Sequence, residues 1–259
     1  MSSQPVTFKK NELNFYLNEL SKEYKRLGGR KAPIEIILIG GAAILENYGF
    51  REMTTDVDAI YPAVSILQEA ANRVSDRFDL PYGWLNSDFM RTESYSEKLH
   101  LYSAHYQTFN QVLDVRIVTG EYMIAMKLRA GRKYKNDLSD IVGILTEHNR
   151  AGDPISFSMI EEAVNNLYGG WDGFPEDSIT FIHTILSLED YEAVYSSIQE
   201  GERLARETLI ELQADRPDTV HRDNIDEILK SAQKEQSSQL SVLVPLEELE
   251  AQNNRAGGG

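Results

Sequence analysis

The chain of 259 residues contains no cysteine. Disulfide bonds and thiolate metal sites are therefore excluded, which agrees with a reducing compartment. The chain also lacks any run of eighteen apolar residues, and its first residues, MSSQPVTFKKNELNFYL, lack a basic segment followed by an apolar one. We therefore expect neither secretion nor a membrane-spanning helix, and we expect a cytoplasmic protein.

Several nucleotide-binding and catalytic motifs are missing as well. No Gly-Xaa-Gly-Xaa-Xaa-Gly follows the first apolar strand, and no Walker-type lysine follows the diglycine Gly40-Gly41. Dehydrogenase and P-loop functions are excluded on that ground. The five histidines have no metal-ligand spacing such as His-Glu-Xaa-Xaa-His, and no role is assigned to them.

Basic residues are scarce in the second part of the chain. Residues 1–150 contain 19 Lys and Arg and 19 Asp and Glu, which leaves 7 of the 26 basic and 22 of the 41 acidic residues for residues 151–259. An RNA substrate would have to approach the first part, because an acidic surface repels phosphates. The acidic part is either a solvated helical face or a docking surface for a basic partner, such as a cognate toxin or antitoxin.

The most informative segment is EIILIGGAAILENYGFREMTTDVDAIY, residues 35–61. The run Ile34–Ile39 predicts a buried strand, Gly40 and Gly41 allow a sharp turn, and Ala42–Asn47 predicts the start of a helix. The unpaired N–H groups and the positive end of the helix dipole would point out of that turn. The segment therefore predicts a site for the triphosphate of a nucleotide.

Two carboxylates follow on the next predicted strand. Asp56 and Asp58 lie two residues apart in Thr55–Ile60, so the strand period places both on one face. Mg²⁺ takes one or two protein carboxylates together with substrate phosphates, and this pair suits it. The alternative is that the glycines only turn the chain and the aspartates edge a strand in solvent.

The order of these features resembles the nucleotidyltransferase superfamily to which polymerase β belongs. In particular, GGAAILENYGFREMTTDVDA is similar to the signature of the minimal nucleotidyltransferases related to the abortive-infection AbiEii proteins. The resemblance covers roughly residues 34–145. It implies a polymerase β-like core with a mixed sheet, an NTP substrate, and Mg²⁺ or Mn²⁺ as cofactor.

A third carboxylate lies further along, in QVLDVRIVT, residues 111–119. This segment predicts a strand with one apolar face and Asp114 on the other. Convergence of Asp114 on Asp56 and Asp58 would complete a two-metal site, and the resemblance gives the third acid this role. The alternative is an exposed Asp114 that pairs with Arg116 across one pleat.

The segment EYMIAMKLRA, residues 121–130, predicts a buried helix that Lys127 interrupts. No carboxylate lies three or four residues from Lys127, so either its stem reaches solvent or its ammonium group reaches a triphosphate. The resemblance favours the second, because KLRAGR followed by Asp-Leu-Xaa-Asp is similar to the AbiEii-like pattern. It implies catalytic roles for Lys127 and Asp137, with Asp140 holding Lys127, Arg129 or Arg132.

Local chemistry offers simpler roles for these groups. Asn136 or Asp137 could be the N-cap of a helix, with Asp140 as the carboxylate that completes a capping box. Asn136 also departs from the resemblance, because many relatives have Arg or Lys there. The basic cluster around Tyr134, and Arg51 near the aspartates, either bind phosphates or lie in solvent; the cluster consists of Arg129, Arg132, Lys133 and Lys135.

The pattern predicts an α/β (α+β) fold in three parts. Residues 1–150 form the nucleotidyltransferase core with a leading helix over Asn11–Leu27, residues 151–229 an acidic helical region, and residues 230–259 a mobile tail. The predicted activity is transfer of a nucleoside monophosphate to a hydroxyl of RNA, possibly tRNA, or of protein. A toxin-antitoxin or phage-defence system would be its setting. The alternative is a non-catalytic binding module with the same fold.

Overall fold

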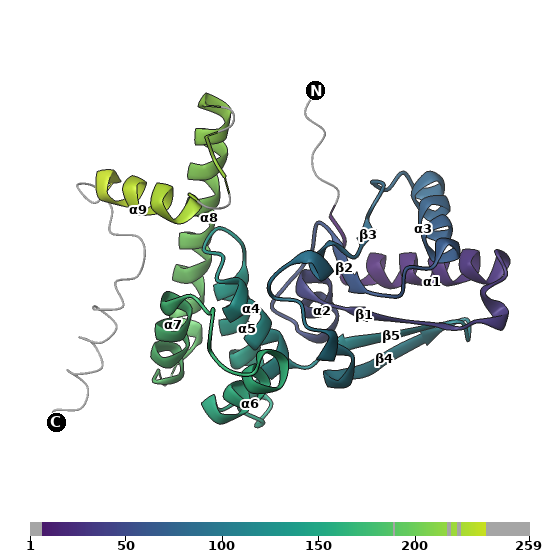
Figure 1. Cartoon of the computed structure of the whole chain (residues 1–259), viewed down its shortest axis with the longest axis horizontal. Helices are drawn as coiled ribbons and strands as arrows, with labels where there is room; N and C mark the ends of the chain where they lie inside the picture. The colour runs from purple at the N-terminus through teal and green to yellow at the C-terminus, as the bar shows by residue number, and fades with distance from the viewer. Residues whose placement is uncertain (1–6, 189, 217–218, 222–223, 237–259) are drawn as a thin grey trace. The chain divides into compact units, whose positions relative to one another are not determined.

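The computed structural model describes residues 7–188, 190–216, 219–221 and 224–236 (Figure 1). Its contacts divide the chain into two compact units, Met1–Met126 with Ser158–Asp172 and Lys127–Phe157 with Gly173–Gly259. The α/β (α+β) fold class is confirmed, because a mixed sheet is accompanied by many helices. No helix of the described residues has the length and apolar character needed to cross a membrane.

The first unit is built on a five-stranded sheet with the order β3-β2-β1-β5-β4. β1 runs parallel to β5 and antiparallel to β2, β2 runs parallel to β3, and β4 is antiparallel to β5. The strands are β1 Ile34–Leu38, β2 Val57–Ile60, β3 Leu85–Asn86, β4 Ser103–Phe109 and β5 Leu113–Val118. Because β1 and β5 are parallel, the segments that follow them leave the sheet at the same edge.

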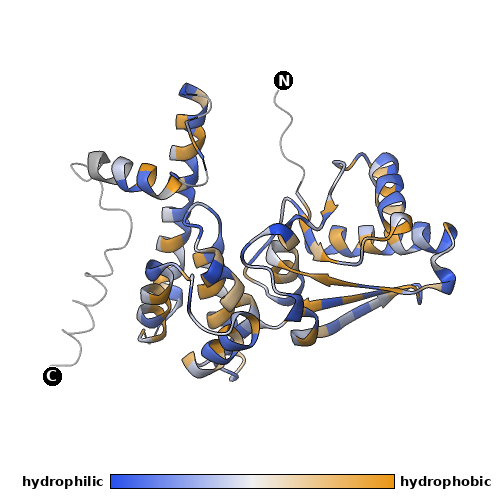
Figure 2. Cartoon of the chain, viewed as in Figure 1, coloured by the Kyte–Doolittle hydropathy of each residue, from blue (hydrophilic) through white to orange (hydrophobic). Residues whose placement is uncertain are grey.

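The two faces of this sheet differ in burial. One face is fully buried and carries Ile36, Leu38, Val57, Ala59, Val115 and Ile117. The other face, which we call the open face, alternates with it in sequence. It carries Glu35, Asp58, Ile60, Asp114 and Arg116, which are exposed or half-buried, and Ile37, which is buried. Figure 2 shows the hydrophobic character that runs along β1 and β5.

Helices of the first unit form where the sequence has an apolar stripe. α1 (Lys10–Arg26) buries Leu13, Leu17 and Leu20 and packs against α3 (Ser65–Phe78). The predicted leading helix is thus confirmed within one residue at each end. Residues Glu97–Tyr102 form a 3₁₀ helix, η3, and β4 begins directly after it at Ser103.

The division into units differs from the predicted boundary at residue 150. The chain passes from the first unit to the second within α4 (Gly120–Ala130), and α6 (Phe157–Tyr168) returns most of its residues to the first unit. Hydrogen bonds explain this return: Ser96 Oγ donates to the carbonyl of Leu167, and Tyr168 donates to the carbonyl of Ser94.

The second unit is helical. Its helices are α5 Asp137–Arg150, α7 Glu176–Leu186, α8 Glu192–Asp215 and α9 Ile225–Gln236, and α5 packs along α8. Residues 230–236 of the expected tail therefore belong to a helix. Residues 237–259, the rest of that tail, lie outside the described residues.

Candidate functional site

The diglycine forms the first turn of α2 (Gly40–Asn47), which begins two residues earlier than expected. Gly40 has a φ of +56°, a left-handed conformation that favours glycine. A Cβ atom on Gly40 would lie 3.5 Å from Asp58 Oδ2. The N-cap residue of α2, Ile39, has no side chain that could accept hydrogen bonds from the first N–H groups of the helix. The turn thus meets a carboxylate and presents backbone donors.

Gly41 is enclosed by the loop that leads to β2. A Cβ atom on Gly41 would lie 2.5 Å from Thr54 Oγ1 and 3.2 Å from the guanidinium carbon of Arg51. Arg51 Nε donates to the carbonyl of Met53, and Thr54 Oγ1 donates to the carbonyl of Asp56. The first turn of α2 therefore has a cation beside it as well as its own N–H groups.

The two aspartates of β2 differ in exposure. Asp58 is partly buried on the open face, and its carbonyl accepts from Ile39 N at 3.1 Å, which places Asp58 level with Ile39 of β1. Asp56 is exposed and precedes the first residue of β2. Carboxylate oxygens are hard donors, so those of Asp56 and Asp58 would fit Mg²⁺ or Mn²⁺ when phosphate oxygens and water complete the coordination.

The prediction that Asp114 joins this pair is wrong. Asp114 is level with Glu35 in the β1–β5 register, four residues from the level of Asp58 and two strands away. That separation is about 13 Å along the strands and about 10 Å across them, well beyond a shared metal. Among the described residues, no three His, Asp or Glu side chains are grouped to hold a metal.

Asp114 also does not make the alternative pair with Arg116. Its carboxylate accepts from Thr108 Oγ1 at 2.7 Å and lies 3.5 Å from His105 Nδ1, both on β4. Arg116 instead lies 3.7 Å from a carboxylate oxygen of Glu35. Residues on neighbouring strands therefore provide the hydrogen-bond and ionic partners of both side chains, and Asp114 is part of the surface of the sheet.

Lys127 belongs to a buried ion network in the second unit. Its side chain is 8% exposed, and Nζ lies 2.7 Å from Asp140 Oδ2 and 3.1 Å from Asp137 Oδ1. Arg132 donates twice to Asp137, at 2.7 and 3.2 Å. The expected contact between Asp140 and Lys127 is confirmed. Lys127 thus neither reaches solvent nor lacks an ionic partner; its partners lie ten and thirteen residues along the chain.

Asp137 is 2% exposed. Burial alone would raise the pKa of its carboxyl group, but the charges of Lys127 and Arg132 outweigh burial and hold that pKa below its ordinary value. Asp137 is therefore ionised and already paired. The expected side-chain cap by Asn136 is absent, because Asn136 Oδ1 accepts from Arg206 instead.

Sequence reasoning missed Glu202 of α8, which takes the capping role. Its carboxylate accepts from the N–H groups of Leu138 and Ser139 at 2.8 and 3.3 Å, and from the Ser139 hydroxyl. Glu202 is 2% exposed. No local signal marks this residue, because it lies more than sixty positions from the two N–H groups that it caps.

The basic cluster is largely engaged within the second unit. Arg129 lies 5.2 Å over the ring of Phe174, Arg132 binds Asp137, and Lys133 is ion-paired with Asp177. Lys135 is exposed. Three of the four cations therefore already have a partner: two are ion-paired with aspartates, and one stacks on an aromatic ring. This reduces the expected attraction of phosphates by the cluster.

The comparisons with known proteins agree with the geometry of the first unit. Residues 16–147 match a family described as "Nucleotidyltransferase of unknown function (DUF6036)". The chain belongs to this family. No curated protein and no solved structure matches the chain.

The match to this nucleotidyltransferase family spans both groups of polar residues. It includes the diglycine turn with Asp58 and the network around Lys127, and it ends before α6. Helices α6 to α9 thus lie beyond the region that defines the family. The AbiEii-like subtype remains a resemblance, since the family description names no such subtype.

Proposed function

We propose that this chain transfers a nucleoside monophosphate from an NTP to a hydroxyl group of RNA, possibly tRNA, or of protein. The observation that carries this proposal is the Asp58 carboxylate beside the diglycine turn, 3.5 Å from where a Cβ atom of Gly40 would lie. A carboxylate at this position repels a phosphate that has no counter-ion, whereas it attracts a phosphate with a bound metal cation. The turn therefore fits a metal nucleotide.

In this reaction the acceptor oxygen attacks the α-phosphorus, the bond from the α-phosphorus to the bridging oxygen breaks, and pyrophosphate leaves. The acceptor proton passes to solvent. The N–H groups of α2 and the guanidinium group of Arg51 bind the pyrophosphate oxygens. Asp56 and Asp58 hold Mg²⁺ or Mn²⁺, which supplies charge neutralisation at the phosphates when it is bound.

The proposal assigns Lys127 a role that differs from contact with the leaving group. Two carboxylates already neutralise its ammonium group. We infer that Lys127 positions Asp137 and Asp140 rather than binding pyrophosphate. A place in a toxin-antitoxin or phage-defence pair, in the cytoplasm, completes the proposal, with the acidic residues 151–259 as the surface for a basic partner.

The test compares the double variant Asp56→Asn with Asp58→Asn against Asp114→Asn. The full chain is incubated with Mg²⁺, each labelled NTP, and total tRNA or the protein encoded by the neighbouring gene. We expect the double variant to lose transfer by at least about a hundredfold, as for loss of a catalytic metal, and Asp114→Asn to match the wild type. Equal loss in both would contradict the site.

One observation favours a second candidate, a non-catalytic binding module. Among the described residues, no three His, Asp or Glu side chains are grouped as a multi-carboxylate metal site would require. In such a module the fold would be retained for contact with a partner protein. Absence of label transfer to any acceptor, with tight binding of the neighbouring protein that the double variant retains, would establish this function instead.

A further inference from the structure

The open face of the sheet contains a groove whose lining residues do not belong to the proposed metal and phosphate site. Its volume is about 500 Å³, and it lies entirely within the first unit. Residues from α1, β1, β2, η2 (Asp88–Arg91) and η3 line it. The side chains that matter most for its chemistry are Tyr24, Glu35, Ile37, Ile60, Met90 and His100.

The groove begins close to Asp58. Ile60 follows Asp58 by two residues on the same face of β2, which is about 7 Å along the strand. Ile60 pairs with Ile37 of β1, and both line the groove. The diglycine turn lies in the opposite direction, because Gly40 follows Ile39, the residue level with Asp58. Asp58 therefore lies between the phosphate-binding turn and the groove.

The lining suits a neutral planar group. No Lys or Arg is among the lining residues, so the groove itself is not built for a phosphate. Its two tyrosines differ in exposure. Tyr24 is 2% exposed and its hydroxyl donates to the carbonyl of Ala32 at 2.7 Å, whereas Tyr61 is half-buried, which raises its pKa. Apolar and aromatic walls with a few polar groups, here Glu35 and His100, are typical of base recognition.

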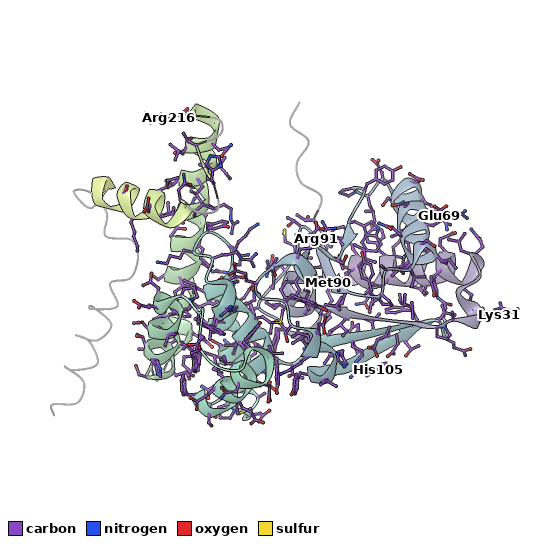
Figure 3. The ribbon with its side chains drawn as sticks, in the orientation of Figure 1. Lys31, Glu69, Met90, Arg91, His105 and Arg216 are labelled. Carbon is purple, nitrogen blue, oxygen red and sulfur yellow. The ribbon has the colours of Figure 1, made fainter. Side chains whose placement is uncertain are left out.

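Two exposed cations adjoin the groove in the chain. Lys31 precedes the lining residue Ala32, and Arg91 follows the lining residue Met90. The Arg91 side chain is 87% exposed. Figure 3 shows Lys31 at the end of the sheet where β1 begins and Arg91 close to Met90. A cation next to a lining residue suits a single strand whose base enters and whose phosphates remain outside; Arg91 Nη1 also lies 3.9 Å from a carboxylate oxygen of Asp88.

We propose that this groove binds the terminal nucleoside of an RNA acceptor, the one whose hydroxyl attacks the α-phosphorus. The proposal rests on the proposed function. In-line displacement places the attacking oxygen opposite the leaving pyrophosphate. Because the pyrophosphate lies at the diglycine turn, the attacking group enters from the other side of Asp58, where the groove begins. A neutral nucleoside also avoids the repulsion that Glu35 and Asp58 would exert on a phosphate.

The experiment measures binding of the four neutral nucleosides and of the dinucleotide CpA to the full chain by ligand-detected NMR, with Mg²⁺ and tripolyphosphate present. Ile60→Ala and Met90→Ala remove groove contacts. Their matched controls are Ile210→Ala and Met159→Ala, which remove the same side chains from positions outside the groove that are 61% and 36% exposed. We expect the groove variants to weaken binding about five- to tenfold, as for one or two lost methylene-sized contacts, and the controls to match the wild type.

Competition identifies the source of the nucleoside. With the acceptor in the groove, a saturating non-hydrolysable NTP leaves nucleoside affinity unchanged. Displacement by the NTP would assign the groove to the base of the NTP and overturn the proposal. Absence of nucleoside binding, together with label transfer to a protein, would also overturn it.

Failure of the groove and failure of the transferase give different results. Absence of nucleoside binding to a wild-type chain that transfers label would refute the groove alone. Nucleoside binding that persists with no transfer to any acceptor would support the groove as a nucleoside site and refute the proposed reaction.

Discussion

Glu202 of α8 makes the stability of the second unit depend on pH near neutrality. Its buried carboxyl group caps α5 through Leu138 and Ser139. Burial raises the pKa of Glu202 to about 7, and the three hydrogen bonds that it accepts only partly oppose that rise. The substitution Glu202→Gln keeps an acceptor for the helix and removes the ionisable proton.

The sign of the effect follows from the direction of this pKa change. Because the pKa of Glu202 is higher in the folded chain than its ordinary value of 4.5, its contribution to stability is fully present below pH 4.5 and is lost as the pH rises through about 7. Between pH 5 and pH 8 the loss is about 2 to 3 kcal/mol. Asp137 acts outside this window, because its lowered pKa makes stability fall only in more acidic solution.

The assay is amide hydrogen exchange at Leu138 and Ser139, combined with urea unfolding, at several pH values from 5 to 8. We expect the wild type to lose stability across this range and Glu202→Gln to lose about 2 to 3 kcal/mol less. Glu200→Gln is the control, since Glu200 lies on the same helix and its pKa is lowered by Arg203. Parallel pH profiles of wild type and Glu202→Gln would refute the reasoning.

Two further predictions concern the two groups of polar residues. Gly41→Ala places a Cβ atom 2.5 Å from Thr54 Oγ1, and we expect NTP affinity to fall about ten- to hundredfold, as for overpacking. The control is Gly49→Ala, whose Cβ atom would meet nothing within 4 Å. Equal NTP affinities of the two variants would contradict the prediction. Lys127→Met leaves two buried carboxylates without their shared cation, and we expect the free energy of unfolding in urea to fall by about 3 to 5 kcal/mol. The control is Lys135→Met at an exposed position, which should change this free energy little. An unchanged unfolding midpoint for Lys127→Met would contradict the role of the network.

The parts of the fold that the sequence predicts are those determined by local patterns. The apolar stripe of Asn11–Leu27 predicts α1 because helical period and glycine punctuation act over a few residues. The closeness of Asp58 to Gly40 is likewise accessible from the sequence, since Gly40 begins the short helix that follows β1 and Asp58 lies on β2, the antiparallel neighbour of β1.

Asp114 shows what local patterns leave out. Alternation along QVLDVRIVT places Asp114 on the face of its strand opposite the apolar residues, and in the structure that face is the open face, which also carries Asp58. The level of Asp114 along the sheet depends on the register between β1 and β5, which are separated by more than seventy residues. A period of two gives the face of a side chain but not its height on the sheet.

The ion network was hidden for a different reason. The positions three and four residues from Lys127, where a helix places its own neighbours, carry no carboxylate. Its partners lie on α5, beyond the end of its helix, and the cap of α5 comes from α8. Contacts between helices depend on packing that no single segment specifies.

The β1–β5 register also decides how many metals the chain's own residues can hold. The residue of β5 level with Asp58 lies at the strand's end, at Val118, so a third ligand from this strand would have to be at or beyond that position. The first carboxylate beyond it is Glu121, in the first turn of α4, where it accepts from the Thr119 hydroxyl at 2.9 Å. No three acidic or histidine side chains of the described residues are grouped for a metal. Under the proposed function, this register favours one cation, held by Asp56, Asp58 and the phosphates of the NTP, over a two-metal site that would need a ligand such as Glu121 from beyond β5.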